Sequence, residues 1–256
     1  MKLVIYPTMD ASRLGEVQSA AGSMQVVNAK SESQAIEEMA TADAFFGKIT
    51  PALLSPAQHL KWVQSPTASL EHYLFPELIS HPCALTNMRG LFYDVIADHV
   101  FGYILMFARR LHLYLRQQID GRWQPIGGEE ERSTFSLGPS HVSGMDLAHV
   151  HMSDCTLGII GLGSIGAEIA RRGAAFSMTV RAVDPSVTTC PDGVNELGDM
   201  NELDDLLQNS DFVVIAAPHT PDTEGMFGSR EFSLMKSNAF LVNIGRGAIV
   251  QLDALV

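Results

Sequence analysis

The sequence predicts an α/β protein made of two similar parts, each a parallel sheet covered by helices. Over residues 1–90, short apolar runs of strand length alternate with helix-like segments, a pattern typical of parallel sheets. A long apolar segment and a polar passage interrupt this alternation, which then resumes. A turn with three glycines opens the second series of strands. The chain has 256 residues, which is enough for two domains of ordinary size.

In the first part, the apolar runs predict strands and the segments between them predict helices. A helix is expected within "SESQAIEEMATA", where Ser31 and Gln34 have the spacing of a capping box. The expected strands cover residues 2–6, 24–28, 43–47, 61–65 and 83–87.

One long helix is expected over residues 92–118. Apolar residues lie on nearly every side of "VIADHVFGYILMFARR", so we expect this helix to be buried on most sides, as between two domains. The passage "DGRWQPIGGEEERSTFSLGPSHVSG" then predicts a surface loop.

In the second part, apolar runs predict strands at 156–160, 179–183, 212–216 and 239–243, with a further one near "GVNEL". Helices are expected at 164–176, 200–209 and 229–236. A doubly wound sheet has six parallel strands, and the sequence after residue 150 supplies at most five.

Composition excludes several classes of function. The net charge is −12, so nucleic acid is not expected as a partner. No segment is long and apolar enough for a membrane span, and "MKLVIYPTMD" turns polar too early for a signal peptide. The three cysteines form neither a zinc pattern nor a disulfide framework. A cytoplasmic location without a metal site is therefore expected.

The stretch "TLGIIGLGSIGAEIARR" (156–172) predicts a dinucleotide-binding turn between a strand and a helix. Gly161 allows the sharp turn, Gly163 lets a pyrophosphate approach, and Gly166 lets the helix pack closely. Free N–H groups at the helix start, around Ser164 and Ile165, would bind the phosphates. Asp184 ends the next strand, where a carboxylate binds the ribose hydroxyls and repels the extra phosphate of NADP. NAD is therefore the expected cofactor.

Further motifs extend over nearly the whole chain. They are "VVIAAPHTPDTEGMFG" (213–228), "LMKSNAFLVNIGRGAIVQLDALV" (234–256), "LKWVQSPTASLEHYLFPEL" (60–78) and "LTNMRGLFYDVIADHVFGYILMFARRL" (85–111). Together with "GLGSIG" and "VDP" they resemble the D-isomer-specific 2-hydroxyacid dehydrogenases. The resemblance implies a flavodoxin-like substrate domain over 1–90. It also implies a Rossmann-type NAD domain over 91–256 that begins with the long interdomain helix.

The resemblance also implies roles for individual residues. Arg246 of "NIGRG" would bind the carboxylate and keto oxygen of a small 2-keto acid, as a guanidinium does well. The backbone of Ala68 and Ser69 would hold the same carboxylate, although the family usually has glycine in place of Ser69. Asp98 stands where many relatives have glutamate, and a buried, partnered helix residue is expected there. The remaining expected cofactor contacts are Pro185, Ala217, Pro218, His219, Thr223, Ile244 and Gly245.

The sequence departs from the family in its acid–base pair. The resemblance implies a glutamate and then a histidine after the catalytic arginine, but the sequence ends at Val256 without either passage. A C-terminally truncated chain, without the last strand and the returning helix, is therefore expected. His219 is a candidate substitute, though it more naturally lies beside the cofactor. His99 and His112 are expected to be core histidines.

The activity that follows is hydride transfer between NAD(H) and a small D-2-hydroxy or 2-keto acid. A non-catalytic NAD-binding module, or an inactive fragment of the family, is the alternative. Formate dehydrogenase and adenosylhomocysteinase share the domain pair, but "NIGRG" and "PHTPDTEG" argue against the second of these. The family pattern also implies a homodimer. The particular 2-hydroxy acid is not readable from the sequence.

Overall fold

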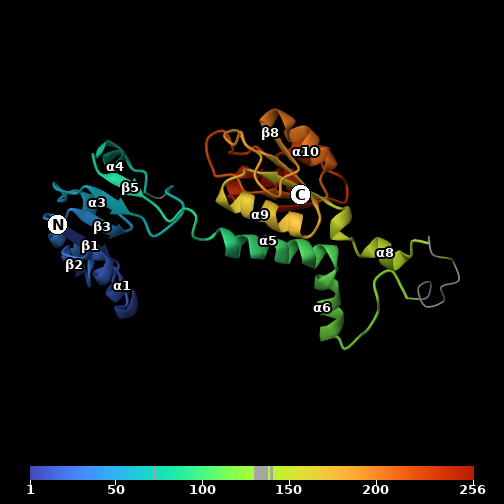
Figure 1. Ribbon diagram of the computed structural model, residues 1–256, viewed down its shortest axis with the longest axis horizontal. Helices are drawn as coiled ribbons and strands as arrows, with labels where there is room; N and C mark the ends of the chain where they lie inside the picture. The colour runs from blue at the N-terminus through green and yellow to red at the C-terminus, as the bar shows by residue number, and fades with distance from the viewer. Residues whose placement is uncertain (72, 130–137, 139–140) are drawn as a thin grey trace. The chain divides into compact units, whose positions relative to one another are not determined.

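The computed structural model describes residues 1–71, 73–129, 138 and 141–256. Within these residues the chain divides into two compact units, Met1–Leu91 and Phe92–Val256, drawn in Figure 1. Each unit contains one five-stranded sheet in which every neighbouring pair of strands is parallel. The predicted α/β class and the parallel sheets are confirmed.

The first sheet has the strand order β2-β1-β3-β4-β5, which is the flavodoxin-like order 2-1-3-4-5. Helices α2, α3 and α4 pack on one face through a core that includes Met39, Phe45 and Leu53. The elements are β1 (Lys2–Tyr6), α1 (Ala11–Ala21), β2 (Gln25–Asn28), α2 (Glu32–Met39), β3 (Ala44–Gly47), α3 (Pro51–Leu54), β4 (Trp62–Gln64), α4 (Pro76–Ser80) and β5 (Ala84–Thr86).

The predicted capping box at α2 forms only in part. The Ser31 hydroxyl accepts the Gln34 N–H at 3.2 Å, as expected. The Gln34 side chain, however, accepts the N–H of Lys30 at 2.9 Å. Ser31 therefore caps the helix, while the return bond of Gln34 goes to the residue before the N-cap.

The second sheet has the order β10-β9-β6-β7-β8. Numbered by appearance this is 5-4-1-2-3, the doubly wound arrangement through its fifth strand. Helices α5 and α9 cover one face and α10 covers the other, so the strands between them are buried. The strands and α-helices from residue 156 onward are β6 (Thr156–Ile160), α9 (Ser164–Ala175), β7 (Thr179–Val183), β8 (Glu196–Gly198), α10 (Leu203–Asn209), β9 (Phe212–Ile215), α11 (Ser229–Leu234), β10 (Phe240–Asn243) and α12 (Leu252–Leu255).

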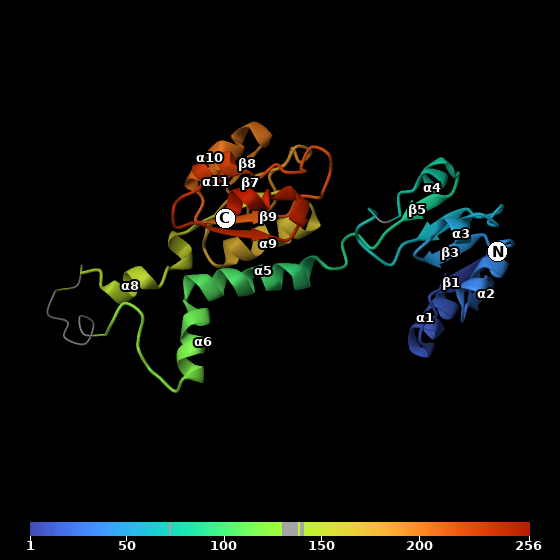
Figure 2. The same cartoon turned by 180° about the vertical axis from the view of Figure 1, so that it is seen from behind.

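The helix predicted over 92–118 is instead two helices, α5 (Tyr93–Ala108) and α6 (Leu111–Ile119). The break falls at Arg110, whose φ of 56° is left-handed and therefore ends regular helix. Two bonds hold this corner: the Ala108 carbonyl accepts the Val150 N–H, and the Arg110 side chain donates to the Ala148 carbonyl. Figures 1 and 2 show α5 lying along α9, with α6 turning away from it.

Within the second unit, this segment is buried on one face only, and its burial between two domains stays a prediction. In α5 the buried residues share one face, which packs on α9 and the sheet: Ala97, Val100, Phe101, Ile104 and Ala108. On other sides Val95 and Tyr103 are exposed. In α6 no residue is buried.

Other predicted boundaries shift by a few residues. The segment expected as one helix from 200 begins with a 3-10 turn, Met200–Glu202, before α10. The helix expected to reach 236 ends at Leu234. The strand expected near "GVNEL" is β8. Part of the predicted surface loop, 130–137 and 139–140, lies outside the described residues, and its end forms helix α8 (Gly144–Ala148).

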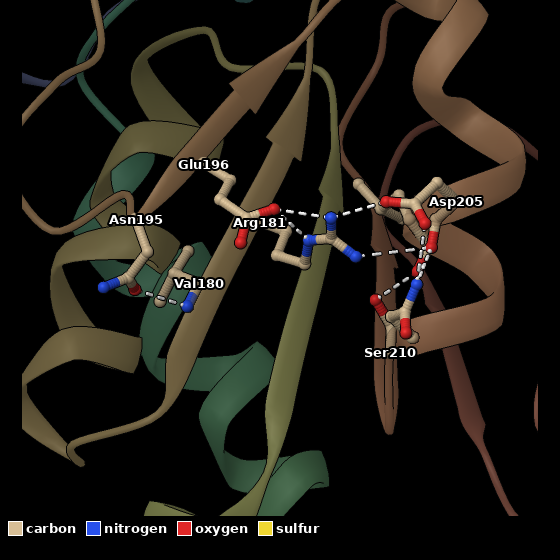
Figure 3. Close-up of polar contacts among 8 residues, drawn as sticks. Val180, Arg181, Asn195, Glu196, Asp205 and Ser210 are labelled. Atoms are coloured by element: carbon tan, nitrogen blue, oxygen red, sulfur yellow. Dashed lines mark hydrogen bonds and ion pairs between the residues drawn. The ribbon is translucent and has the colours of Figure 1, made fainter.

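Arg181 connects β8, the edge strand of the second sheet, to helix α10. Figure 3 shows Arg181 of β7 reaching between Glu196 of β8 and Asp205 of α10. The Arg181 Nε lies 2.7 Å from Glu196 Oε2, and burial, which lowers its pKa, is outweighed by the two carboxylates, which raise it. Asn195 adds a bond to the Val180 N–H at 2.7 Å. These contacts hold the short strand β8 against β7, the strand that leads to Asp184.

Candidate dinucleotide and substrate site

Four predicted site segments meet at one edge of the second sheet. Because β6, β7, β9 and β10 are parallel and in register, their carboxyl ends lie side by side, with Ile160 paired to both Val183 and Ile215. The strand order reverses between β6 and β9, and ligands of open α/β sheets bind where this reversal occurs. The arrangement brings together the glycine turn, Asp184, the loop after β9 and the turn that carries Arg246.

Each glycine of the turn has its own geometric reason. Gly161 has a φ of 93°, and a Cβ there would lie 2.7 Å from the backbone nitrogen of Ala217. A Cβ on Gly163 would meet nothing within 4 Å, so the space in front of this residue is open. A Cβ on Gly166 would lie 2.1 Å from the Gly161 carbonyl oxygen. Gly166 therefore packs more closely against the glycine turn than against the side chains of the sheet.

The start of α9 fits an anionic group. Gly163 is the N-cap residue, and no side chain caps the helix among the described residues. The first N–H groups of a helix have no partner within it, and here Ser164 is exposed and Ile165 half-buried. A helix of this length also has a positive dipole end at that point. The open space at Gly163 and these N–H groups suit a pyrophosphate.

Asp184 follows β7 and accepts three backbone hydrogen bonds. Its Oδ2 accepts the Leu162 N–H at 2.7 Å, and its Oδ1 accepts the N–H groups of Ser186 at 2.8 Å and Val187 at 3.1 Å. Burial alone would raise the pKa of this carboxyl, but the three N–H donors outweigh it and lower the pKa. Asp184 is therefore ionised at neutral pH. The next residue, Pro185, is exposed.

The loop after β9 is ordered by its own threonine. The Thr223 hydroxyl donates to the Pro218 carbonyl at 2.7 Å and accepts the Thr220 N–H at 2.8 Å. Ala217 is buried at the base of the loop. His219 Nε2 lies 3.7 Å from Glu224 Oε2, beyond hydrogen-bonding distance. This histidine thus has a carboxylate neighbour that the sequence analysis did not anticipate.

The turn after β10 places Arg246. Asn243 supports it on both sides, because its Oδ1 accepts the Gly245 N–H at 3.0 Å and its Nδ2 donates to the Arg246 carbonyl at 2.9 Å. A Cβ on Gly245 would lie 2.6 Å from the Ala217 carbonyl oxygen. The arginine side chain itself is exposed, and its Nη1 donates to the Gly245 carbonyl. The half-buried Ile244 packs on the sheet core.

Backbone and side-chain bonds join this turn to the loop after β9. The N–H groups of Gly225 and Phe227 donate to the carbonyls of Ala248 and Ile249, at 2.8 and 3.0 Å. The Gln251 side chain donates to the Gly225 carbonyl at 2.6 Å. The Arg246 turn and the cofactor loop are therefore one connected structure. Sequence reasoning missed Asn243 and Gln251; a polar residue ending a buried strand was the available signal for Asn243.

In the first unit, the loop of Ala68 and Ser69 is held from two sides. Asn87 Nδ2 donates to the Ala68 carbonyl at 2.7 Å, and the Met88 N–H donates to the Thr67 carbonyl at 3.0 Å. Within the described part of the chain, the N–H groups of Ala68 and Ser69 themselves have no hydrogen-bond acceptor. Two adjacent backbone donors of this kind can receive a carboxylate. Asn87 was also missed.

Two expectations outside the site need correction. Asp98 does have a partner, because Arg172 Nη2 lies 3.0 Å from its Oδ1, but its side chain is 70% exposed and not buried. His99 is not a core histidine either: it is exposed and bonds the Tyr103 hydroxyl at 2.8 Å. His112 is half-buried beside Phe107. Within the described ranges, no three His, Cys, Asp or Glu side chains are grouped to hold a metal ion.

The fold and this edge define a two-unit α/β protein whose second unit is built to bind a dinucleotide. Residues 101–256 match the D-isomer specific 2-hydroxyacid dehydrogenase, NAD binding domain. The chain belongs to the D-isomer specific 2-hydroxyacid dehydrogenase family.

Relatives and solved structures agree with this assignment. The chain is 31% identical to a glyoxylate reductase of Thermococcus litoralis over 82% of its own length and 59% of that protein. It is 28% identical to glyoxylate/hydroxypyruvate reductase B of Klebsiella pneumoniae, over 99% of this chain and 75% of the relative. A crystal structure of a D-isomer specific 2-hydroxyacid dehydrogenase family protein from Aeromonas salmonicida superposes with a TM-score of 0.78 at 27% identity. It covers 99% of this chain and 76% of that one.

The chain thus spans about three fifths of the length of the T. litoralis reductase. No helix formed by the described residues is both long and apolar enough to cross a membrane.

Proposed function

We propose that this chain binds NAD(H) and forms the dehydrogenase site of an enzyme that interconverts a small 2-keto acid and its D-2-hydroxy acid. One observation carries the proposal. The glycine turn, the loop after β9 and the Arg246 turn meet at Ala217, where Cβ atoms on Gly161 and Gly245 would collide with its backbone. The turn that leads to the start of α9 and the turn that carries the exposed Arg246 therefore share one neighbour at the edge of the sheet, which supports the proposal.

The roles proposed for the residues follow from their chemistry. NADH, when bound, supplies the hydride. Arg246 would pair with the substrate carboxylate and polarise the keto oxygen, where negative charge grows as the hydride adds to the keto carbon. In the first unit, the adjacent N–H groups of Ala68 and Ser69 are a second candidate contact for a carboxylate. The new C–O⁻ oxygen then needs one proton, and His219 beside Glu224 is the histidine of this edge that could carry it.

NAD is proposed in preference to NADP. Asp184 is ionised at neutral pH, because its pKa is lowered by backbone donors despite partial burial. A 2′-phosphate beside this carboxylate would meet like charge, whereas ribose hydroxyls can donate to it. The name of the K. pneumoniae relative points to glyoxylate and hydroxypyruvate as first substrates to try.

The test separates binding from turnover. NADH and NADPH are titrated by fluorescence, and NADH oxidation is then followed with glyoxylate, hydroxypyruvate, pyruvate and longer 2-keto acids. The chain and any longer product of the same gene are compared. NADH binding followed by turnover of at least one acid is the expected result. Binding without turnover in either protein would favour a non-catalytic NAD-binding module, and absence of binding would remove the proposal altogether.

We further propose a homodimer in the cytoplasm, paired through α6. This helix of nine residues buries none of them, yet short helices in water depend on packing for stability. Leu111, Leu115 and Ile119 follow one face at a spacing of four and are 50%, 57% and 76% exposed, and Trp123 beyond the helix is 75% exposed. An isologous contact would cover this stripe with the same stripe of a second chain.

The measurement is the molar mass by light scattering of the wild type and of Leu115→Glu. Loss of dimer mass in the variant is expected, and a wild-type monomer at micromolar concentration would contradict the contact. The unpaired state of Cys83, Cys155 and Cys190 agrees with a reducing compartment.

A further inference from the structure

The carboxylate of Asp184 bonds to the glycine turn as well as to its own loop. Its Oδ2 lies 2.7 Å from the N–H nitrogen of Leu162, which stands between Gly161 and Gly163. Its Oδ1 accepts the N–H groups of Ser186 and Val187. One side chain therefore ties together the turn after β6 and the loop after β7.

This bond begins where the sheet ladder stops. The last ladder bond between β6 and β7 runs from the Gly161 N–H to the Val183 carbonyl, at 2.9 Å. The chain then turns at Gly161, with its φ of 93°, and the next N–H along bonds the Asp184 side chain. Leu162 is buried, with 4% of its surface exposed, and a buried N–H without an acceptor is costly. Asp184 supplies that acceptor.

We propose that Asp184 is a positioning residue that fixes the glycine turn before any dinucleotide binds, in addition to the ribose contact expected of it. The order of the turn without a ligand does not depend on the proposed function. Only the consequence for phosphate binding rests on the proposed function.

The consequence concerns changes that remove the charge. In Asp184→Asn the amide oxygen can still accept the N–H groups of Ser186 and Val187, but the amide nitrogen is a donor and cannot accept from Leu162. The variant would therefore loosen the phosphate-binding turn while removing the charge that repels NADP. NAD affinity should fall, and NADP binding should not appear in compensation.

Hydrogen exchange measured by mass spectrometry without cofactor tests the anchor. The wild type, Asp184→Asn and Asp199→Asn are compared over peptides that contain residues 157–166. Asp199 is the matched control, since its carboxylate accepts the Asn201 N–H at the start of a 3-10 turn. A hydrogen bond to a charged acceptor is strong enough to change local opening about tenfold. We expect about tenfold faster exchange near Leu162 in Asp184→Asn and wild-type exchange in Asp199→Asn.

Equal exchange in all three proteins would restrict Asp184 to the ribose and overturn the proposal. If Asp184→Asn does not fold, the wild type alone decides by NMR. The Leu162 amide proton must then shift with the titration of one carboxyl whose pKa lies below that of an ordinary aspartate, and an unmoved resonance overturns the proposal. NADH titration of the wild type is a separate arm. Its failure would refute the proposed function and leave the exchange result intact.

Discussion

Replacing Gly161 by alanine should destabilise the second unit, whereas the same change at Gly163 should leave stability intact and weaken NADH binding. At Gly161 the φ of 93° costs an L-residue about 1–2 kcal/mol. The added Cβ would also lie 2.7 Å from the Ala217 nitrogen, and overpacking of this kind costs about 1–3 kcal/mol. The expected loss in the free energy of unfolding is therefore about 2–5 kcal/mol, a large share of the total for most domains.

At Gly163 neither penalty applies. Its φ of −69° suits alanine, and its Cβ would meet nothing within 4 Å. The stability of Gly163→Ala should stay within about 1 kcal/mol of the wild type, because the gain from restricting the unfolded chain is offset by the poorer N-cap that alanine makes. The methyl group would stand where a pyrophosphate must approach, so NADH affinity should fall about tenfold or more.

Urea unfolding followed by circular dichroism gives the free energy of unfolding, and NADH fluorescence gives the affinity. The reasoning is refuted if Gly163→Ala loses as much stability as Gly161→Ala, or if it binds NADH as tightly as the wild type.

Three further predictions concern single side chains. Arg246→Lys should lower kcat/KM about 100-fold without changing NADH affinity, because lysine cannot bind a carboxylate in a bidentate way. Steady-state kinetics and NADH titration measure the two quantities. An unchanged kcat/KM would show that Arg246 takes no part in the reaction. The pKa of Asp184 is lowered in the folded protein, so its contribution to stability is complete above its unfolded pKa and is lost as the pH falls through the folded pKa. The melting temperatures of the wild type and Asp184→Asn should therefore converge as the pH falls from about 6 to 3. A difference that stays constant with pH would be evidence against this linkage. Arg181→Met should lower the free energy of unfolding by about 1 kcal/mol, because it removes the partly exposed ion pairs with Glu196 and Asp205. Urea unfolding measures this change. A more stable variant would show that the ion pairs are not stabilising.

The pattern of strands was predictable because parallel strands buried on both faces leave continuous apolar runs. The predicted boundaries 2–6, 156–160 and 179–183 agree with β1, β6 and β7 to the residue. The break between α5 and α6 was not predictable from periodicity. Neither glycine nor proline stands at the corner around Arg110, and the bonds that fix the corner come from Ala148 and Val150, about forty residues later.

Predictability at the site divides in a similar way. The positions of Gly161, Asp184 and Arg246 just after strand ends could be predicted, because each follows an apolar run. The partners that orient them could not, because they depend on contacts between distant segments. The bond from Leu162 to Asp184 and the bond from Asn87 to Ala68 are of this kind. Such contacts become visible only when neighbouring strand ends are brought together.

The backbone of Ala217 lies between two glycines from different turns, and this has a consequence for how the sequence can change. A side chain at Gly245 would require the Ala217 carbonyl to move, while one at Gly161 would require its nitrogen to move. Substitutions at these positions therefore share a neighbour, and their energies need not add. If the loop after β9 moves to admit a side chain at Gly161, the energetic cost of a side chain at Gly245 changes as well. The three positions form an epistatic set, so a change at one alters which residues are permitted at the other two.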